Sequence, residues 1–101
     1  MVTYNLKELE TTEFEDNPQK VFYEGNNFTT RIIKLSAGSE IPDCEMSASV
    51  IFIVISGSVK VKVNNESSEL NEGECLVTEP APVSMQSEEG AKVMGIQIEH
   101  N

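Results

Sequence analysis

The sequence has few of the side chains on which metal sites and acid–base sites depend. Its 101 residues include one histidine, two cysteines and no tryptophan. The histidine, His100, follows the last predicted strand, where a lone imidazole is expected to be solvated rather than bound to a metal. Aromatic residues make up 6% of the chain. We therefore expect a mostly aliphatic core, in which valine and isoleucine favour strands.

Basic side chains are also scarce. The chain has 17 acidic and 7 basic residues, which gives a formal net charge of -10 at pH 7. Such a surface repels the phosphates of nucleic acids and of anionic lipids. The sequence thus predicts no nucleic-acid partner and no membrane partner, and we expect an acidic cytoplasmic protein.

Long hydrophobic runs are missing as well. The longest, Val50 to Ile55, has six residues, whereas a membrane span needs about 20. Residues 1–20 are acidic and contain no apolar run, so we expect no signal peptide. Without export, Cys44 and Cys75 are predicted to be reduced thiols. The simplest interpretation of Cys75 is a small buried residue.

The chain length suits one domain over residues 1–101, with an N-terminal extension over 1–20 and a barrel core over 28–98. After the extension, short apolar runs are separated by turn signals every ~8 to 12 residues, which is typical of a β-sandwich or barrel. Ser56-Gly57 predicts a tight hairpin, and Asn64-Asn65 predicts the next turn.

The predicted strand Val50–Ile55 is apolar on both faces. Its predicted neighbour, Ser58–Val63, alternates valine with lysine, so one face is buried and the other is wet. A strand that is apolar on both faces is covered on both sides. We expect one face of Val50–Ile55 to line the interior and the other to pack on a second sheet or subunit. The sequence therefore predicts a homodimer that buries this second face.

The order of strands and turns from Phe28 to Ile98 resembles the cupin superfamily, whose members are small jelly-roll barrels. The first motif of that family runs Gly, five residues, His-x-His, three or four residues, Glu, six residues, Gly. Gly38 and Gly57 fit its two glycines, and Pro42 lies where a proline commonly precedes the first histidine. The resemblance implies an all-β fold, a double-stranded β-helix or jelly-roll barrel.

The metal-ligand positions of this pattern hold other residues. Cys44 and Met46 fall on the two histidines of the first motif, and Val50 falls on its glutamate. The second motif runs Gly, five residues, Pro-x-Gly, two residues, His. An ungapped alignment places Ser84 on that histidine, and one extra residue places Met85 there. We prefer Met85, because that alignment keeps the proline.

These replacements predict a barrel with no metal, no cofactor and no catalytic residue. Iron, manganese, nickel and zinc sites of this kind need imidazole and carboxylate ligands, and Val50 cannot coordinate a metal. The predicted function is that of a non-catalytic barrel that binds a small apolar or amphipathic molecule, or that serves as an interaction module. The predicted ligand pocket is lined by Cys44, Met46, Val50, Phe52 and Met85.

Two other functions stay open. Cys44, Met46 and Met85 offer a thiolate and two thioethers, a soft donor set suited to Cu(I), although the same residue types fill apolar barrels. A small metal-free isomerase or lyase would instead need titratable groups that converge in a pocket. The candidate polar groups, each of them more common on a surface, are Arg31, Glu40, Glu79, Ser84, Gln86 and Gln97, with Tyr23 as the phenol.

Overall fold

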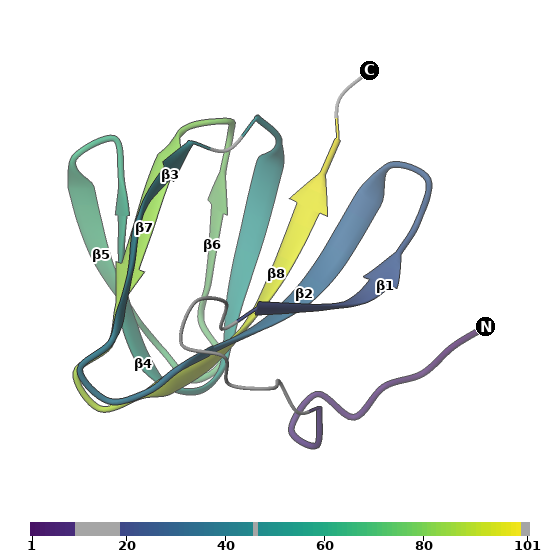
Figure 1. The fold of residues 1–101 in the computed structure, drawn as a ribbon, viewed down its shortest axis with the longest axis horizontal. Helices are drawn as coiled ribbons and strands as arrows, with labels where there is room; N and C mark the ends of the chain where they lie inside the picture. Colours follow the sequence, from purple (N-terminus) through teal and green to yellow (C-terminus); the bar gives the residue numbers. More distant parts are fainter. Residues whose placement is uncertain (10–18, 46, 100–101) are drawn as a thin grey trace.

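In the computed structural model, eight strands form one antiparallel sheet that curls into a half-barrel (Figure 1). The structure describes residues 1–9, 19–45 and 47–99, with the backbone alone for Gln19 and residues 43–45. The strands are β1 (Gln19–Glu24), β2 (Phe28–Leu35), β3 (Glu40–Glu45), β4 (Ser49–Val63), β5 (Glu66–Asn71), β6 (Cys75–Thr78), β7 (Pro82–Gln86) and β8 (Ala91–Ile98). The all-β prediction is confirmed.

The long strand β4 belongs to both walls of the half-barrel. Its first half pairs with β8 and β6, in a wall whose order is β1-β2-β8-β4-β6. Its second half pairs with β7 and β5, in a wall whose order is β3-β7-β4-β5. The walls meet at the lower edge of Figure 1 and separate toward the top of the view. This is the jelly-roll type of architecture that the sequence predicts.

The hairpin predicted at Ser56-Gly57 is wrong, because both residues lie inside β4. Pairing with β8 ends at Gly57, and pairing with β5 begins at Ser58. Gly57 has φ +78°, and a Cβ there would overlap the carbonyl oxygen of Gly90. Glycine is needed at this point for a left-handed backbone and a close approach. It forms the corner at which β4 passes from one wall to the other.

The turn predicted at Asn64-Asn65 is confirmed. The two asparagines have φ 48° and φ 69°, and Val63 is in register with Glu66 across the turn. Two consecutive left-handed residues are the conformation of a two-residue hairpin whose twist matches that of its strands. Asparagine tolerates this conformation better than most residues.

Strand β3 was not among the predicted strands. It contains Pro42, which cannot donate a hydrogen bond to a neighbouring strand. Its register with β7 shifts between Ile41 and Cys44, and β7 is the neighbour with which it pairs in the described part of the chain. A proline and a register shift are tolerated at the edge of a sheet, so β3 is an irregular edge strand.

The core lies between the two walls and is aliphatic apart from Phe52, as predicted. Val50, Phe52 and Val54 reach it from the first half of β4, whereas Val59 and Val61 reach it from the second half. The remaining members of the core are Ile33, Leu35, Leu70, Val83, Met85, Ala91 and Val93.

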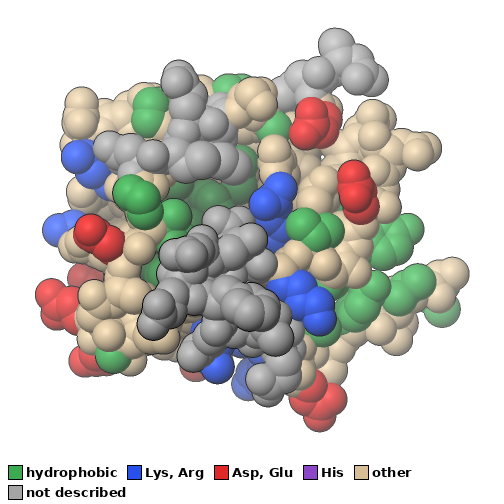
Figure 2. Space-filling view, viewed as in Figure 1, with side chains coloured by type: hydrophobic (Ala, Val, Ile, Leu, Met, Phe, Trp, Pro, Cys, Tyr) green, Lys and Arg blue, Asp and Glu red, His purple; other side chains and the backbone are tan. Residues whose placement is uncertain are grey.

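Part of the predicted N-terminal extension packs on the sheet. The Tyr4 hydroxyl donates a hydrogen bond to the Phe22 carbonyl at 3.0 Å, and Lys92 Nζ donates one to the Lys7 carbonyl at 3.0 Å. Figure 2 shows hydrophobic side chains gathered at the right edge of the view, where Figure 1 places β1 and the N-terminus. Within the described ranges, no helix is long and apolar enough to cross a membrane.

Candidate ligand site

Three of the five predicted pocket residues lie together in the interior. Val50 and Phe52 come from β4 and Met85 comes from β7, and their exposed fractions are 2%, 5% and 4%. All three belong to the core between the walls. Strand alternation explains this placement, because residues two apart on a strand point to the same face.

The other two predicted pocket residues are Cys44 and Met46. The backbone of Cys44 lies in β3, in register with Val83 of β7. The side chain of Cys44 and the whole of Met46 lie outside the described residues. The proposed pocket and the proposed Cu(I) donor set both remain predictions at these two positions.

The structure shows which of the two candidates for the last ligand position, Ser84 or Met85, points into the interior. Val83 and Met85 face the core, so Ser84 and Gln86 alternate to the opposite face. Met85 is therefore the residue that points inward, and Ser84 points outward.

Two residues that the resemblance assigns to ligand positions of the family lie in the interior. Val50, which the resemblance aligns with the carboxylate, is buried with an aliphatic side chain that has no donor atom. Met85, which the preferred alignment places on the last imidazole, has a thioether, which is a poor ligand for a hard or borderline divalent ion. Across the described ranges, no three His, Cys, Asp or Glu residues are grouped so that they can hold an ion.

Two polar residues do meet on the inner face of the β2–β8 pair. Arg31 Nη2 donates a hydrogen bond to Gln97 Oε1 at 3.0 Å, in partly buried surroundings. Ile33 on β2 and Val93 on β8 face the core. Arg31 lies two residues before Ile33 on β2, and Gln97 lies four residues after Val93 on β8. Alternation thus places the guanidinium and the amide on the core side of this wall.

Arg31 lies in the same cross-strand row as Phe52. Arg31 on β2 is in register with Gly95 on β8, and Gly95 is in register with Phe52 on β4. A Cβ on Gly95 would lie 3.4 Å from Phe52 Cε1. The phenyl ring therefore lies over the backbone of Gly95, in the space that a larger residue would take.

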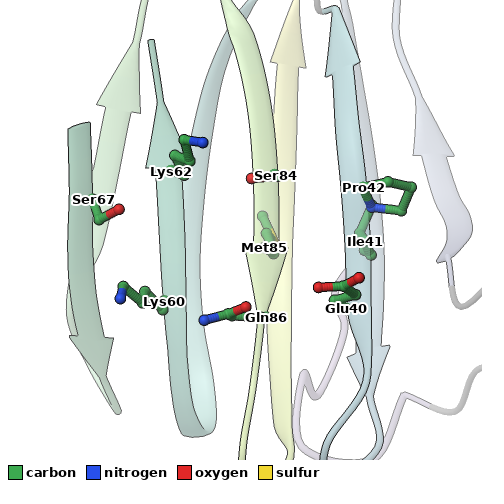
Figure 3. A pocket seen from close by; sticks show the side chains of 9 residues that line it. All are labelled: Glu40, Ile41, Pro42, Lys60, Lys62, Ser67, Ser84, Met85 and Gln86. Carbon is green, nitrogen blue, oxygen red and sulfur yellow. The ribbon is translucent and has the colours of Figure 1, made fainter. Parts of the chain in front are cut away.

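The other candidate polar groups lie elsewhere. Glu40, Ser84 and Gln86 line a hollow of about 340 Å³ on the outer face of the β3-β7-β4-β5 wall, together with Lys60 and Lys62 (Figure 3). In register across the strands, Gln86 lies between Glu40 and Lys60. This hollow opens on the outer face, and its lining also includes Ile41 and Met85 from the core side of β3 and β7.

The last two candidates contact other residues. Glu79 Oε2 accepts a hydrogen bond from the exposed Ser49 hydroxyl at 3.1 Å. The Tyr23 ring is 41% exposed and stacks on Phe28 with 5.8 Å between ring centroids. Of the polar candidates named from the sequence, the structure brings Arg31 and Gln97 together on an inner face, and it brings Glu40, Ser84 and Gln86 together on the outer face of the other wall.

The expectation that Cys75 is buried is wrong, because Cys75 is exposed. It is the first residue of β6 and is in register with Ile53 of β4. Val54 and Phe52 face the core, so Ile53 faces outward, and its partner on the flanking strand faces outward as well. A small apolar residue at an edge strand needs no burial.

Across β2, β8, β4 and β6, the outer face of the β1-β2-β8-β4-β6 wall carries two cross-strand rows without charged residues, bordered by Lys20 of β1 and by Lys34 and Lys92 in the next row. The first row joins Thr30, Ile96, Ile51 and Val77, and the second joins Ile32, Met94, Ile53 and Cys75. Val77 is 70% exposed, whereas the isoleucines at 51, 53 and 96 are half-buried. The outward face of β4 is therefore apolar, as its sequence predicts.

Solved structures of low sequence identity share this architecture. A protein from Thermus thermophilus is similar over 100% of this chain and 100% of its own, with a TM-score of 0.87 and 18% identity. An RmlC-like cupin protein from Desulfovibrio desulfuricans is similar over 97% of this chain and 96% of its own, with a TM-score of 0.83 and 18% identity.

A third similar structure is a known enzyme. Salicylate 1,2-dioxygenase from Pseudoaminobacter salicylatoxidans matches 71% of this chain with a TM-score of 0.68 and 25% identity. The match covers 20% of the dioxygenase chain, so this chain spans only about a fifth of that enzyme. No protein-family model and no curated protein matches the sequence.

Proposed function

Since this chain has the cupin fold, we propose that it is a non-catalytic barrel that binds a small apolar or amphipathic molecule between its two walls. The observation that carries this proposal is the buried apolar side chain of Val50, at the position where the family has a metal-binding carboxylate. Met85 and Phe52 lie in the same interior. Aromatic and thioether groups suit an apolar ligand, because they adapt to its shape.

The test is an NMR titration of the full chain with 1-hexanol, a small amphipathic probe. We expect saturable shift changes at Val50, Phe52 and Met85. Met85→Phe adds volume to the interior and is expected to weaken binding about tenfold. Ser84→Phe is the matched control, because Ser84 is next on the same strand and faces outward. Hexanol shifts that map to the outer hollow, or equal effects of the two variants, would contradict the proposal.

Elemental analysis of the protein purified without a chelator provides a second test. Iron, manganese, nickel or zinc near one per chain would contradict a metal-free barrel. Copper near one per chain that is lost in Met85→Leu would support instead the soft donor set of Cys44, Met46 and Met85. We expect no stoichiometric metal of either kind.

We also propose that two copies of the chain associate through the outer face of the β1-β2-β8-β4-β6 wall. The chain has a net charge of -10, yet the two rows contain no charged residue across β2, β8, β4 and β6, and the charged residues that border them, Lys20, Lys34 and Lys92, are basic. A second copy carries the same charge, so an uncharged face is where two copies repel each other least. A two-fold dimer would place the same rows against each other.

A further inference from the structure

We propose that the outer hollow of the β3-β7-β4-β5 wall binds a small phosphate monoester that has no second anionic group. The hollow has a volume of about 340 Å³, which is enough for a small molecule. It opens on the outer face of the wall, whereas the apolar ligand proposed above lies between the two walls. The proposal therefore goes beyond the proposed function and does not depend on it.

The first reason is a pair of cations on one side of the hollow. Val59 and Val61 of β4 face the core, so Lys60 and Lys62 point to the outer face, where both line the hollow (Figure 3). Residues two apart on a strand have Cα atoms about 7 Å apart, so the two flexible ammonium groups can reach the same group of a ligand. Two of the 7 basic residues of this acidic chain are thus placed at one hollow.

The second reason is the set of neutral polar groups beside these cations. Lys62 is in register with Ser67 of β5 and with Ser84 of β7, and Lys60 is in register with Gln86 of β7. The two serines and the glutamine also line the hollow. Hydroxyl and amide groups can donate hydrogen bonds to phosphate oxygens, and they leave the charge of the lysines uncompensated.

The third reason is that no carboxylate among the described residues pairs with either lysine. Even Glu69, in register with Lys60 on β5, forms no ion pair with it and does not line the hollow. Two neighbouring ammonium groups repel each other, and a ligand that brings matching negative charge relieves this repulsion. A phosphate monoester brings about 1.5 to 2 negative charges at pH 7, whereas a carboxylate brings one. The pair of lysines therefore favours a phosphate.

The opposite side of the hollow defines the rest of the ligand. Glu40 of β3 lines this side and is in register with Gln86, which lies between Glu40 and Lys60 (Figure 3). Two strand spacings, about 10 Å, separate the backbone of Glu40 from that of Lys60. The carboxylate repels a second anionic group and accepts hydrogen bonds from hydroxyl groups. We therefore expect a phosphate monoester whose other end is polar and not anionic.

The test is an NMR titration of the full chain at low ionic strength with three probes of three carbons each, namely glycerol 3-phosphate, 3-phosphoglycerate and glycerol. We expect glycerol 3-phosphate to cause saturable shift changes at Lys60, Lys62 and Ser84. It should bind about tenfold more tightly than 3-phosphoglycerate, which has the same phosphate and a carboxylate in addition. Glycerol, which has no phosphate, is expected to cause no saturable change.

Substitutions of the lysines identify the group that binds the phosphate. Lys60→Gln and Lys62→Gln are each expected to weaken the binding of glycerol 3-phosphate about tenfold, because each removes a charge-assisted hydrogen bond. Lys20→Gln is the matched control, since Lys20 is an exposed lysine on β1 in the other wall. It removes the same charge from the chain and should leave the affinity unchanged.

Substitution of Glu40 tests the other end of the ligand. Glu40→Gln is expected to remove most of the preference for glycerol 3-phosphate over 3-phosphoglycerate. Glu24→Gln, at an exposed position of β1, removes the same charge and should leave the preference in place. This control separates the local effect of Glu40 from the net charge of the chain, which also repels the more highly charged probe.

Three results would overturn the proposal without affecting the proposed ligand of the interior. The first is the absence of saturable shifts at the outer hollow with glycerol 3-phosphate at millimolar concentration. The second is an equal loss of affinity in Lys20→Gln, Lys60→Gln and Lys62→Gln, which would show that total charge alone controls binding. The third is 3-phosphoglycerate binding as tightly as glycerol 3-phosphate, or a preference that Glu40→Gln and Glu24→Gln change equally.

Discussion

Ser87 illustrates how single residues close the lower end of the half-barrel. It is buried, with an exposed fraction of 4%. Its hydroxyl donates a hydrogen bond to the Ser58 carbonyl at 2.6 Å and accepts one from the Gly90 amide at 2.9 Å. Its backbone exchanges two more hydrogen bonds with residues 38 and 39, which precede β3. This one residue thus links the corner of β4 and the turn before β8 through its side chain, and the loop before β3 through its backbone.

We predict that Ser87→Ala lowers the free energy of unfolding by about 1 to 3 kcal/mol, because it leaves a buried carbonyl and a buried amide without their partner. Urea denaturation at equilibrium measures this change. Ser84→Ala is the control, since Ser84 lies on the outer face, and it should change stability by less than about 0.5 kcal/mol. An equal effect of the two substitutions would mean that the network around Ser87 is not stabilising.

The residues of the predicted site show which features of a site can be predicted from a sequence pattern. Val50, Phe52 and Met85 are buried in the core, as alternation along a strand predicts, and their role in lining a ligand pocket stays a prediction. Arg31 and Gln97 were named only among six polar candidates. Whether they face inward and meet depends on the register between β2 and β8, which are far apart in the chain. Such a register is a tertiary property that the sequence pattern did not specify.

At the scale of elements, β4 shows how a local signal can be correct while its interpretation is wrong. The glycine at position 57 does need a left-handed backbone, as the predicted hairpin required. A hairpin and a corner between two walls both use such a residue, and the apolar runs on either side are similar. The distinction depends on the partner strands, and these come from distant parts of the chain.

Gly57→Ala is predicted to destabilise the fold by about 2 kcal/mol or more. Part of this cost is the left-handed backbone, which costs a residue with a Cβ about 1 to 2 kcal/mol. The rest is the collision of the new methyl group with the backbone of Gly90, which neither strand can relieve without moving. Thermal unfolding and urea denaturation both measure the loss.

Gly38→Ala is the matched control for this prediction. Gly38 has φ +80°, close to the φ +78° of Gly57, but a Cβ there would meet nothing within 4 Å. Its substitution should therefore show the backbone cost alone. If both variants lose the same stability, the close approach of β4 to the turn before β8 contributes nothing, and the corner is specified by backbone conformation only.

At the scale of the whole molecule, the surface includes one patch without charged side chains. Along the left edge of Figure 2, where Figure 1 places β5, basic side chains lie above acidic ones. The opposite wall carries the two uncharged rows on its outer face, which include Ile51, Ile53, Met94 and Ile96. These four side chains are half-buried and Val77 beside them is 70% exposed, so a second copy on this face would bury further apolar surface.

Val77→Glu tests that dimer with little effect on the single chain. Val77 is 70% exposed, so the substitution removes hardly any buried surface from the isolated barrel. In a two-fold dimer through this face, the new carboxylates of both copies would lose water in an apolar contact. We predict that light scattering after gel filtration shows a dimer for the native chain and a monomer for Val77→Glu, with unchanged circular dichroism.

Val2→Glu, at an exposed valine of the N-terminal segment, should remain dimeric. A native chain that stays monomeric at millimolar concentration would refute the dimer. A Val77→Glu variant that stays dimeric would instead move the contact to another face, and the apolar rows would then need a different explanation.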